Sequence, residues 1–178
     1  MTTNGELGAA ESHFERALRI EPKNAEYHSA YAYLLDQLGR KDQAASESET
    51  AIRLAPKSAQ AHYGYGAFLE KHGQPDQAIT KYRQALQLDP AYVDAHIDLG
   101  TLLLAKGELT EARNHLEKAS ELNPKLAQPH NYLGKILMSQ GNVPAAIAQF
   151  EEALRLHPDF PEAEENLRVA KASSAQVP

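Results

Sequence analysis

The stretch VDAHIDLGTLLLAKGELTEARNHLEKASELNPKL, residues 93–126, contains one complete copy of the unit from which this chain is built. Its proline is one of five that stand 34 residues apart and end similar phrases (ALRIEP, AIRLAP, ALQLDP, ASELNP and ALRLHP), namely Pro22, Pro56, Pro90, Pro124 and Pro158. A constant period of about 20 to 50 residues indicates a repeat architecture, in which each copy is one supersecondary unit. The period therefore predicts a stack of similar units rather than one central core.

Each unit is predicted to be helix, turn, helix. Before Gly107 one set of residues, most of them small or apolar, falls at spacings of three and four, and a second set does so after it, which is the pattern of one helical face. These residues are His96, Leu99, Gly100, Leu103 and Leu104, then Leu109, Ala112, Leu116 and Ala119. Glycines recur at the same place as Gly39, Gly73, Gly107 and Gly141, where they can take a positive φ after a first helix.

The repeat sets the expected domain organisation, a single solenoid domain over residues 5–171 with about ten helices. Four whole units cover residues 25–58, 59–92, 93–126 and 127–160, and residues 161–171 form a terminal helix whose charged faces meet water. Residues 1–24 match only the second half of a unit, so we expect the chain to start inside a repeat. Residues 172–178 are expected to fray.

Helix ends are predicted from single residues. Asp42, Asp76 and Thr110 stand where three second helices should begin, and their side-chain oxygens could accept hydrogen bonds from free backbone N–H groups. Pro144 holds that place in the fourth unit, which suits a first turn. The periodic prolines should end each second helix, because a residue before proline disfavours the α region.

Composition excludes several classes of protein. The 178 residues carry a net charge of −6, which disfavours nonspecific nucleic-acid binding, and the absence of cysteine excludes disulfides and thiolate metal sites. No apolar run approaches the ~18 residues of a membrane span, and the first residues show no signal peptide. We therefore expect a cytoplasmic protein, although a longer parent chain would leave its compartment open.

The units resemble the tetratricopeptide repeat (TPR), whose pattern of Leu-Gly, Tyr, Ala, Phe and Pro has the same period. The third unit matches at Leu99-Gly100, Leu103, Ala112, Leu116, Ala119 and Pro124, and the second and fourth units match at the corresponding places. The first unit departs from the pattern, because Ser48 stands where the others have Tyr82, Leu116 or Phe150. The resemblance implies an all-α solenoid of antiparallel helix pairs, wound as a right-handed superhelix with the first helices lining a concave groove.

No catalytic or cofactor chemistry is predicted. The chain contains no HExxH, no glycine-rich phosphate loop and no nucleophile elbow. His28, His62, His96 and His130 repeat every 34 residues and are interpreted as packing residues rather than a metal ladder, while His13, His72, His115 and His157 are expected in solvent. We expect a non-enzymatic chain without cofactor or metal.

The resemblance also places the groove on recurring positions of the first helices. Carried onto this chain, these positions hold Glu26, Tyr33, Asp36, Tyr63, Glu70, Asp94, Ile97, Asp98, Leu104, Tyr132 and Lys135. Tyrosines and aliphatic residues among many carboxylates would suit a peptide with an apolar anchor and basic residues. Two known subtypes of the family do not fit. One uses a clamp of Lys, Arg and Asn to bind a C-terminal carboxylate, but the matching places here hold Ser29, Tyr33, Gly64 and Asp98. The other uses a ladder of asparagines to hold a peptide backbone, but its places here hold Ala30, Gly64, Asp98 and Tyr132.

Three functions remain open at this point. The leading hypothesis is a scaffold that binds a protein or peptide partner. The alternatives are a segment that packs on its own longer chain or self-associates, and a regulatory arm of an enzyme, such as a glycosyltransferase, whose catalytic domain lies outside this sequence. The sequence also predicts lower local stability around Ser48, because a small polar residue there buries less apolar surface than the large residue of the other units.

Overall fold

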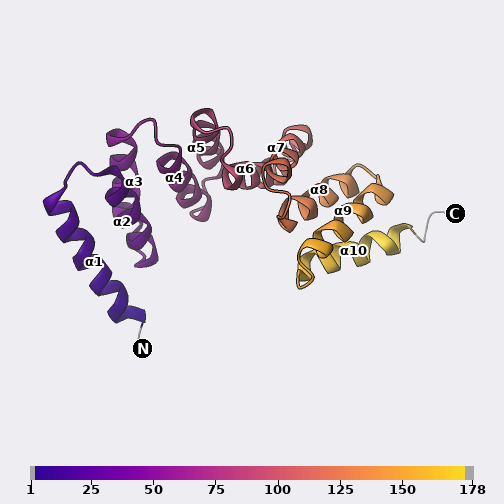
Figure 1. The fold of residues 1–178 in the computed structure, drawn as a ribbon, viewed down its shortest axis with the longest axis horizontal. Helices are drawn as coiled ribbons and strands as arrows, with labels where there is room; N and C mark the ends of the chain where they lie inside the picture. The colour runs from indigo at the N-terminus through magenta and orange to yellow at the C-terminus, as the bar shows by residue number, and fades with distance from the viewer. Residues whose placement is uncertain (1–2, 175–178) are drawn as a thin grey trace. The chain divides into compact units, whose positions relative to one another are not determined.

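The computed structural model describes residues 3–174, with side chains from residue 7 onward. Within this range the chain forms ten α-helices, joined by short turns (Figure 1). They group into two compact bodies, Met1–Tyr92 and Val93–Pro178. The all-α fold of antiparallel helix pairs agrees with the architecture expected from the sequence.

The N-terminal body contains five helices: α1 (Thr3–Ile20), α2 (Ala25–Gln37), α3 (Lys41–Leu54), α4 (Ala59–Lys71) and α5 (Pro75–Leu88). Helix α2 pairs with α3, and α4 pairs with α5; α1 packs on α2, and α4 also contacts α2 and α3. A stacked ring pair, Phe14 and Tyr31, joins α1 to α2 at a centroid distance of 5.9 Å. An ion pair between Glu11 of α1 and Arg40, which follows α2, also joins these two parts of the chain.

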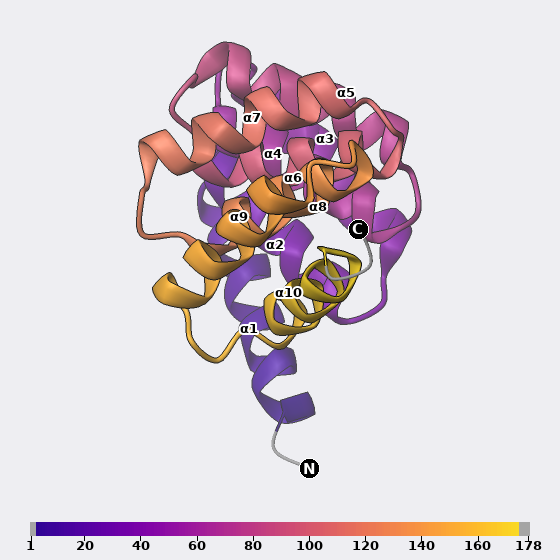
Figure 2. The ribbon, with the colours of Figure 1, turned by 90° about the vertical axis from the view of Figure 1, so that its right-hand side faces the viewer.

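The C-terminal body also contains five helices: α6 (Val93–Ala105), α7 (Leu109–Leu122), α8 (Ala127–Ser139), α9 (Val143–Leu156) and α10 (Pro161–Ser174). Helices α6 and α7 form one pair and α8 and α9 the next, while α10 lies against both α8 and α9 (Figure 2). Phe150 of α9 and Ala170 of α10 are buried in one core cluster, with Leu137 and Leu167 packed against it. This last helix thus covers the final pair.

Every first helix ends in the same hydrogen-bonded turn. Gly39 has φ +75°, and its N–H donates to the carbonyl of Asp36, while the N–H of Arg40 donates to Leu35. This is a Schellman turn, which favours glycine because a Cβ strains a positive φ. The turn recurs with the same two bonds at Gly73, Gly107 and Gly141, so the sequence-based C-caps are confirmed.

The predicted N-caps of the second helices are wrong. Helices α3, α5 and α7 begin at Lys41, Pro75 and Leu109, so the proposed caps, Asp42, Asp76 and Thr110, lie one residue inside the first turn. The Schellman turn leads directly into the next helix, which leaves the residue after glycine as the cap. Asp42 and Asp76 still suit the first turn, where a negative charge favours the positive end of the helix dipole.

Side-chain caps occur on two first helices and on one second helix, α9, where Asn142 Oδ1 accepts from the N–H of Ala145. The Asn24 Oδ1 accepts from the N–H groups of Glu26 and Tyr27, and Ser58 Oγ accepts from Ala61. In the fourth unit Pro144 lies in the first turn of α9, as predicted. The second helices end two residues before their prolines, at Leu54, Leu88, Leu122 and Leu156.

Candidate binding face of the first helices

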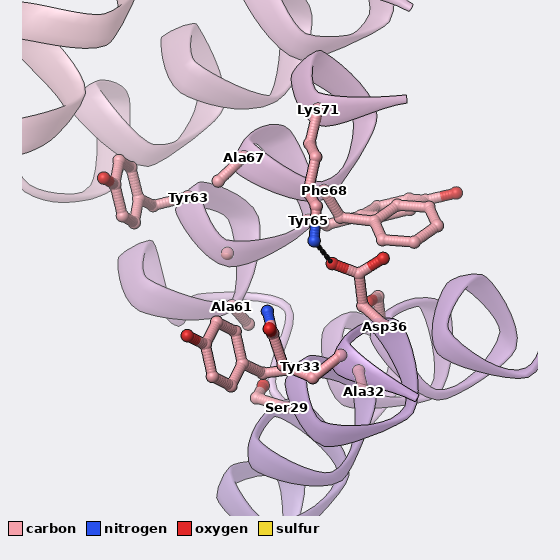
Figure 3. A pocket seen from close by; sticks show the side chains of 13 residues that line it. Ser29, Ala32, Tyr33, Asp36, Ala61, Tyr63, Tyr65, Ala67, Phe68 and Lys71 are labelled. Carbon is pink, nitrogen blue, oxygen red and sulfur yellow. Dashed lines mark hydrogen bonds and ion pairs between the residues drawn. The ribbon is translucent and has the colours of Figure 1, made fainter. Parts of the chain in front are cut away.

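The N-terminal body has a hollow of about 340 Å³ between α2 and α4. Ala32, Ser48 and Ala61 lie among its lining, Tyr33 and Tyr63 flank it on one side, and Tyr65 and Phe68 stand on the other (Figure 3). A more open hollow of about 1050 Å³ adjoins it, with Glu26 and Tyr92 among its lining. Both hollows include Tyr33 and Tyr63, so they form one recessed surface, called here the α2–α4 face.

The smaller hollow lies where the first unit has a small residue, Ser48, in place of a large side chain. In the second unit the Tyr82 ring is fully buried against Gly66, so close that a Cβ on Gly66 would lie 2.7 Å from it. The first unit has Ser48 in place of the tyrosine and Ala32 in place of the glycine. Ser48 is buried, and its hydroxyl donates to the Ala44 carbonyl at 2.9 Å, so its polar group is satisfied within its own helix.

One wall of the hollow is a stack of rings on α4. Tyr65 stacks on Phe68 at 6.0 Å, and Phe68 packs on His72 at 4.5 Å. The Tyr65 hydroxyl donates to Glu49 on α3 at 3.1 Å, and burial together with this carboxylate raises the pKa of Tyr65. Because the ring is held at both its face and its hydroxyl, this wall is pre-formed.

The opposite wall is a second aromatic cluster. The Tyr63 ring lies 4.8 Å from that of Tyr92 and 5.6 Å from that of Tyr82. Tyr33 stands beside it on α2 with 70% of its surface exposed, the largest exposure of an aromatic residue among the described residues. Such an exposed ring at the rim of an apolar hollow is typical of a binding surface.

An ion-pair network joins α2 to α4 at the edge of the hollow. The Asp36 carboxylate accepts from Lys71 Nζ at 2.6 Å (Figure 3). It also accepts from a ring nitrogen of His72 at 2.6 Å. Burial alone would raise the pKa of Asp36, but the hydrogen bonds from Lys71 and His72 lower it below its ordinary value. Asp36 is therefore a charged structural tie rather than a free groove carboxylate.

The sequence-based groove residues of the N-terminal body divide into two groups. Glu26, Tyr33 and Tyr63 line the hollows. Asp36 also lines one, but it is held by the ion pairs, and Glu70 accepts from the Tyr82 hydroxyl at 2.6 Å. The acidic character expected of this face is thus concentrated at Glu26.

The groove residues of the C-terminal body also differ in availability. Asp94 is exposed on α6, and Asp98 and Leu104 are half-buried, but Ile97 is only 4% exposed and offers little surface to a partner. On α8 the Lys135 ammonium lies 5.2 Å from the Tyr132 ring centroid and 3.0 Å from Glu162 of α10. This lysine is already engaged with both.

The repeating histidines pack between helices. His28 and His62 each bind the carbonyl of a periodic proline, Pro22 and Pro56, and a second-helix side chain. His96 binds His115, and His130 binds Gln149. The expectation that His72 and His115 are solvated was wrong, because they bind Asp36 and His96, whereas His13 and His157 are exposed.

The sequence-based groove did not include Tyr65, Phe68 and Lys71, which line the smaller hollow, nor His72, which packs on Phe68 and binds Asp36. Their spacing of three and four on α4 was the available signal. Among residues 3–174 no group of three or more potential metal ligands converges, and no helix is long and apolar enough to cross a membrane.

Family models match most of the chain. Models described as tetratricopeptide repeat match residues 13–45, 37–93 and 69–136, and one described as TPR repeat matches residues 134–167. No curated protein matches the sequence.

Several solved structures share the fold. A crystal structure of MamA is 23% identical with a TM-score of 0.77, covering 88% of this chain and 91% of its own. YrrB, described as a TPR protein with an unusual peptide-binding site, is 22% identical with a TM-score of 0.75, covering 92% and 84%. PilF of Pseudomonas aeruginosa is 23% identical with a TM-score of 0.76, covering 85% and 69%. At these identities the likeness concerns the fold.

Proposed function

Because the chain belongs to the tetratricopeptide repeat family, we propose that it is a non-catalytic scaffold that binds a peptide or protein segment on its first helices. The observation that carries this proposal is the α2–α4 face. It is recessed, mostly apolar and flanked by Tyr33, which is 70% exposed. A partner that covers this hollow would bury the exposed ring together with the apolar lining.

The structural relatives support peptide binding as the mode of recognition. YrrB is described as a TPR protein with an unusual peptide-binding site, and the matched family models describe the same repeat. The groove residues of α6 and α8, from Asp94 to Lys135, are a separate candidate surface of the C-terminal body. A role as regulatory arm of an enzyme would use the same surface on a longer chain.

The test is a selection of displayed random 12-residue peptides on the whole chain, followed by titration of the recovered peptides. We expect Tyr33→Ala to weaken binding by about tenfold or more, as for an interface hot spot. Leu88→Ala is the matched control, because Leu88 is an exposed apolar residue of the same body but lies on a second helix. Equal binding to the wild type and to Tyr33→Ala, or failure to recover any peptide, would contradict the proposal.

Charge is tested separately with the exposed carboxylates, Glu26 and Asp94. If basic residues of the partner contact them, Glu26→Gln with Asp94→Asn should weaken binding and flatten its salt dependence, because exposed charges are screened over ~10 Å at 0.1 M salt. Helicity by circular dichroism is the control for folding. Binding that is insensitive to both the double variant and salt would remove the basic partner from the proposal.

A further inference from the structure

The hollow over Ser48 lies where each of the other three units places a large side chain of its own. In three units a large side chain of the second helix lies against a glycine of the first: Tyr82 on Gly66, Leu116 on Gly100 and Phe150 on Gly134. All three large side chains are at most 1% exposed. The first unit alone has small residues at both places, Ala32 and Ser48, and there the hollow opens.

We propose that this hollow is an anchor site for one aromatic side chain, a phenylalanine or tyrosine, of the bound segment. The inference rests on the proposed function and specifies the partner of the same face. Three observations on the N-terminal body support it: the volume of the hollow, the chemistry of its walls and the distribution of charge around it.

The volume suits one large side chain. The hollow measures about 340 Å³, which is at the lower end of the range of about 300 to 1000 Å³ found for small ligand sites. In the neighbouring unit the corresponding space is filled by a complete tyrosine ring. An aromatic side chain from a partner would therefore complete a packing arrangement that the fold already uses.

The walls favour an aromatic group over an aliphatic one. Tyr33 and Tyr63 stand on one side of the hollow, and Tyr65 and Phe68 stand on the other (Figure 3). Aromatic pairs gain stability beyond their buried area when the rings are offset or tilted. The deeper lining requires no hydrogen bond from the occupant, because the Ser48 hydroxyl already donates to Ala44.

The charges specify what flanks the anchor. Three charged residues line the two hollows, and two of them, Asp36 and Lys71, neutralise each other at 2.6 Å. The inner hollow is therefore electrically neutral, as an uncharged ring requires. Glu26 is the remaining charged residue and lies in the outer hollow, so the segment should place a lysine or arginine beside the anchor.

The decisive experiment fills the hollow from within. The double variant Ala32→Gly with Ser48→Tyr copies the Gly66 and Tyr82 pair of the second unit, and Ser48→Leu is a milder plug that copies Leu116 of the third. Ser48→Ala is the matched control, because it keeps the hollow open. The probes are the peptides recovered from the 12-residue display and, separately, N-acetyl-phenylalaninamide, followed by the NMR shift of the Gly64 amide that lines the hollow.

We expect the recovered peptides to share one aromatic residue, and its replacement by alanine to weaken binding about tenfold or more. Both plugs should weaken the same peptides by a similar factor and abolish the fragment-induced shift at Gly64, whereas Ser48→Ala should retain both. The plugs should also raise the unfolding midpoint, which shows that they fold and fill the space.

The outcomes separate the anchor from the wider function. Peptides that bind both plugs as tightly as the wild type, yet lose affinity with Tyr33→Ala, would overturn the anchor and leave the scaffold standing. Self-association of the wild type that both plugs abolish, without peptide binding, would assign the hollow to a second copy and overturn the proposed partner. If N-acetyl-phenylalaninamide binds but no displayed peptide does, both the peptide-binding scaffold and the aromatic anchor of a bound peptide are contradicted.

Discussion

At the scale of single residues, packing depends on which helix of a pair carries the large side chain and which carries the glycine that faces it. Gly100 faces Leu116 so closely that a Cβ would lie 2.8 Å from Leu116 Cγ and 3.3 Å from the Ala112 carbonyl oxygen. Gly64 also lies within a first helix, but a Cβ added there would meet nothing within 4 Å. Glycine is therefore sterically required at position 100 but not at position 64.

This contrast gives the first prediction. Gly100→Ala should lower the free energy of unfolding by ~1–3 kcal/mol, because overpacking displaces Leu116. Gly64→Ala should raise it by about 1 kcal/mol, because alanine is the better helix former and meets open space. Urea titrations followed by circular dichroism measure both, and the same sign of change at the two sites would contradict the steric assignment.

At the scale of helices, α2 and α4 are joined by the ion pairs of Asp36 as well as by packing. Because hydrogen bonds from Lys71 and His72 lower the pKa of Asp36 against the effect of burial, its ionised form stabilises the folded state. This contribution is fully present above the ordinary pKa of 3.8 and is lost as the pH falls through the lower pKa of the folded state.

Asp36→Asn should therefore destabilise the chain at neutral pH by roughly 1 kcal/mol, a typical value for a hydrogen-bonded charge that is partly exposed to solvent. The difference from the wild type should shrink as the pH falls below 3.8. Denaturant titrations at several pH values test this, with Asp42→Asn, a first-turn carboxylate of α3, as the control. A constant difference between Asp36→Asn and the wild type at all pH values would show that the carboxylate charge is not the cause.

At the scale of the whole molecule, stability should be uneven along the chain. In a repeat protein it is roughly a sum of unit and nearest-neighbour terms, so a poorly filled interface stays local. The hollow over Ser48 is such an interface in the first whole unit. Hydrogen exchange should therefore show opening that begins within residues 5–56 while residues 93–160 remain protected. Uniform protection, or faster exchange in the third unit than in the first, would refute this.

A companion variant tests the cause. Ser48→Leu should slow exchange in residues 25–56 and raise the unfolding midpoint, because a buried large apolar side chain contributes ~1.5–3 kcal/mol. Exchange in the C-terminal body should not change. A lower midpoint would mean that the bond from Ser48 to Ala44 matters more than the unfilled volume.

The class of fold could be predicted from the amino-acid order alone, because a period of 34 residues is a local and repeated signal. The helix ends at Gly39 and its three equivalents, and the contact of Gly66, Gly100 and Gly134 with large residues, also follow from position within the unit. Ser48 departs from that pattern, and a departure is visible without coordinates. The first residues of the second helices could not be predicted, because a Schellman turn moves the start of the next helix by one or two residues.

The polar residues that remain available to a partner could be identified only from the packed helices. Asp36, Glu70 and His72 look like surface groups in the sequence, but partners 12 to 36 residues away engage them across helices. The same is true of the hollow: the sequence shows that Ser48 is small, whereas its volume and its ring of tyrosines arise from α2, α3 and α4 together. Side-chain packing between helices depends on contacts among several units, so the sequence pattern of a single unit does not determine it.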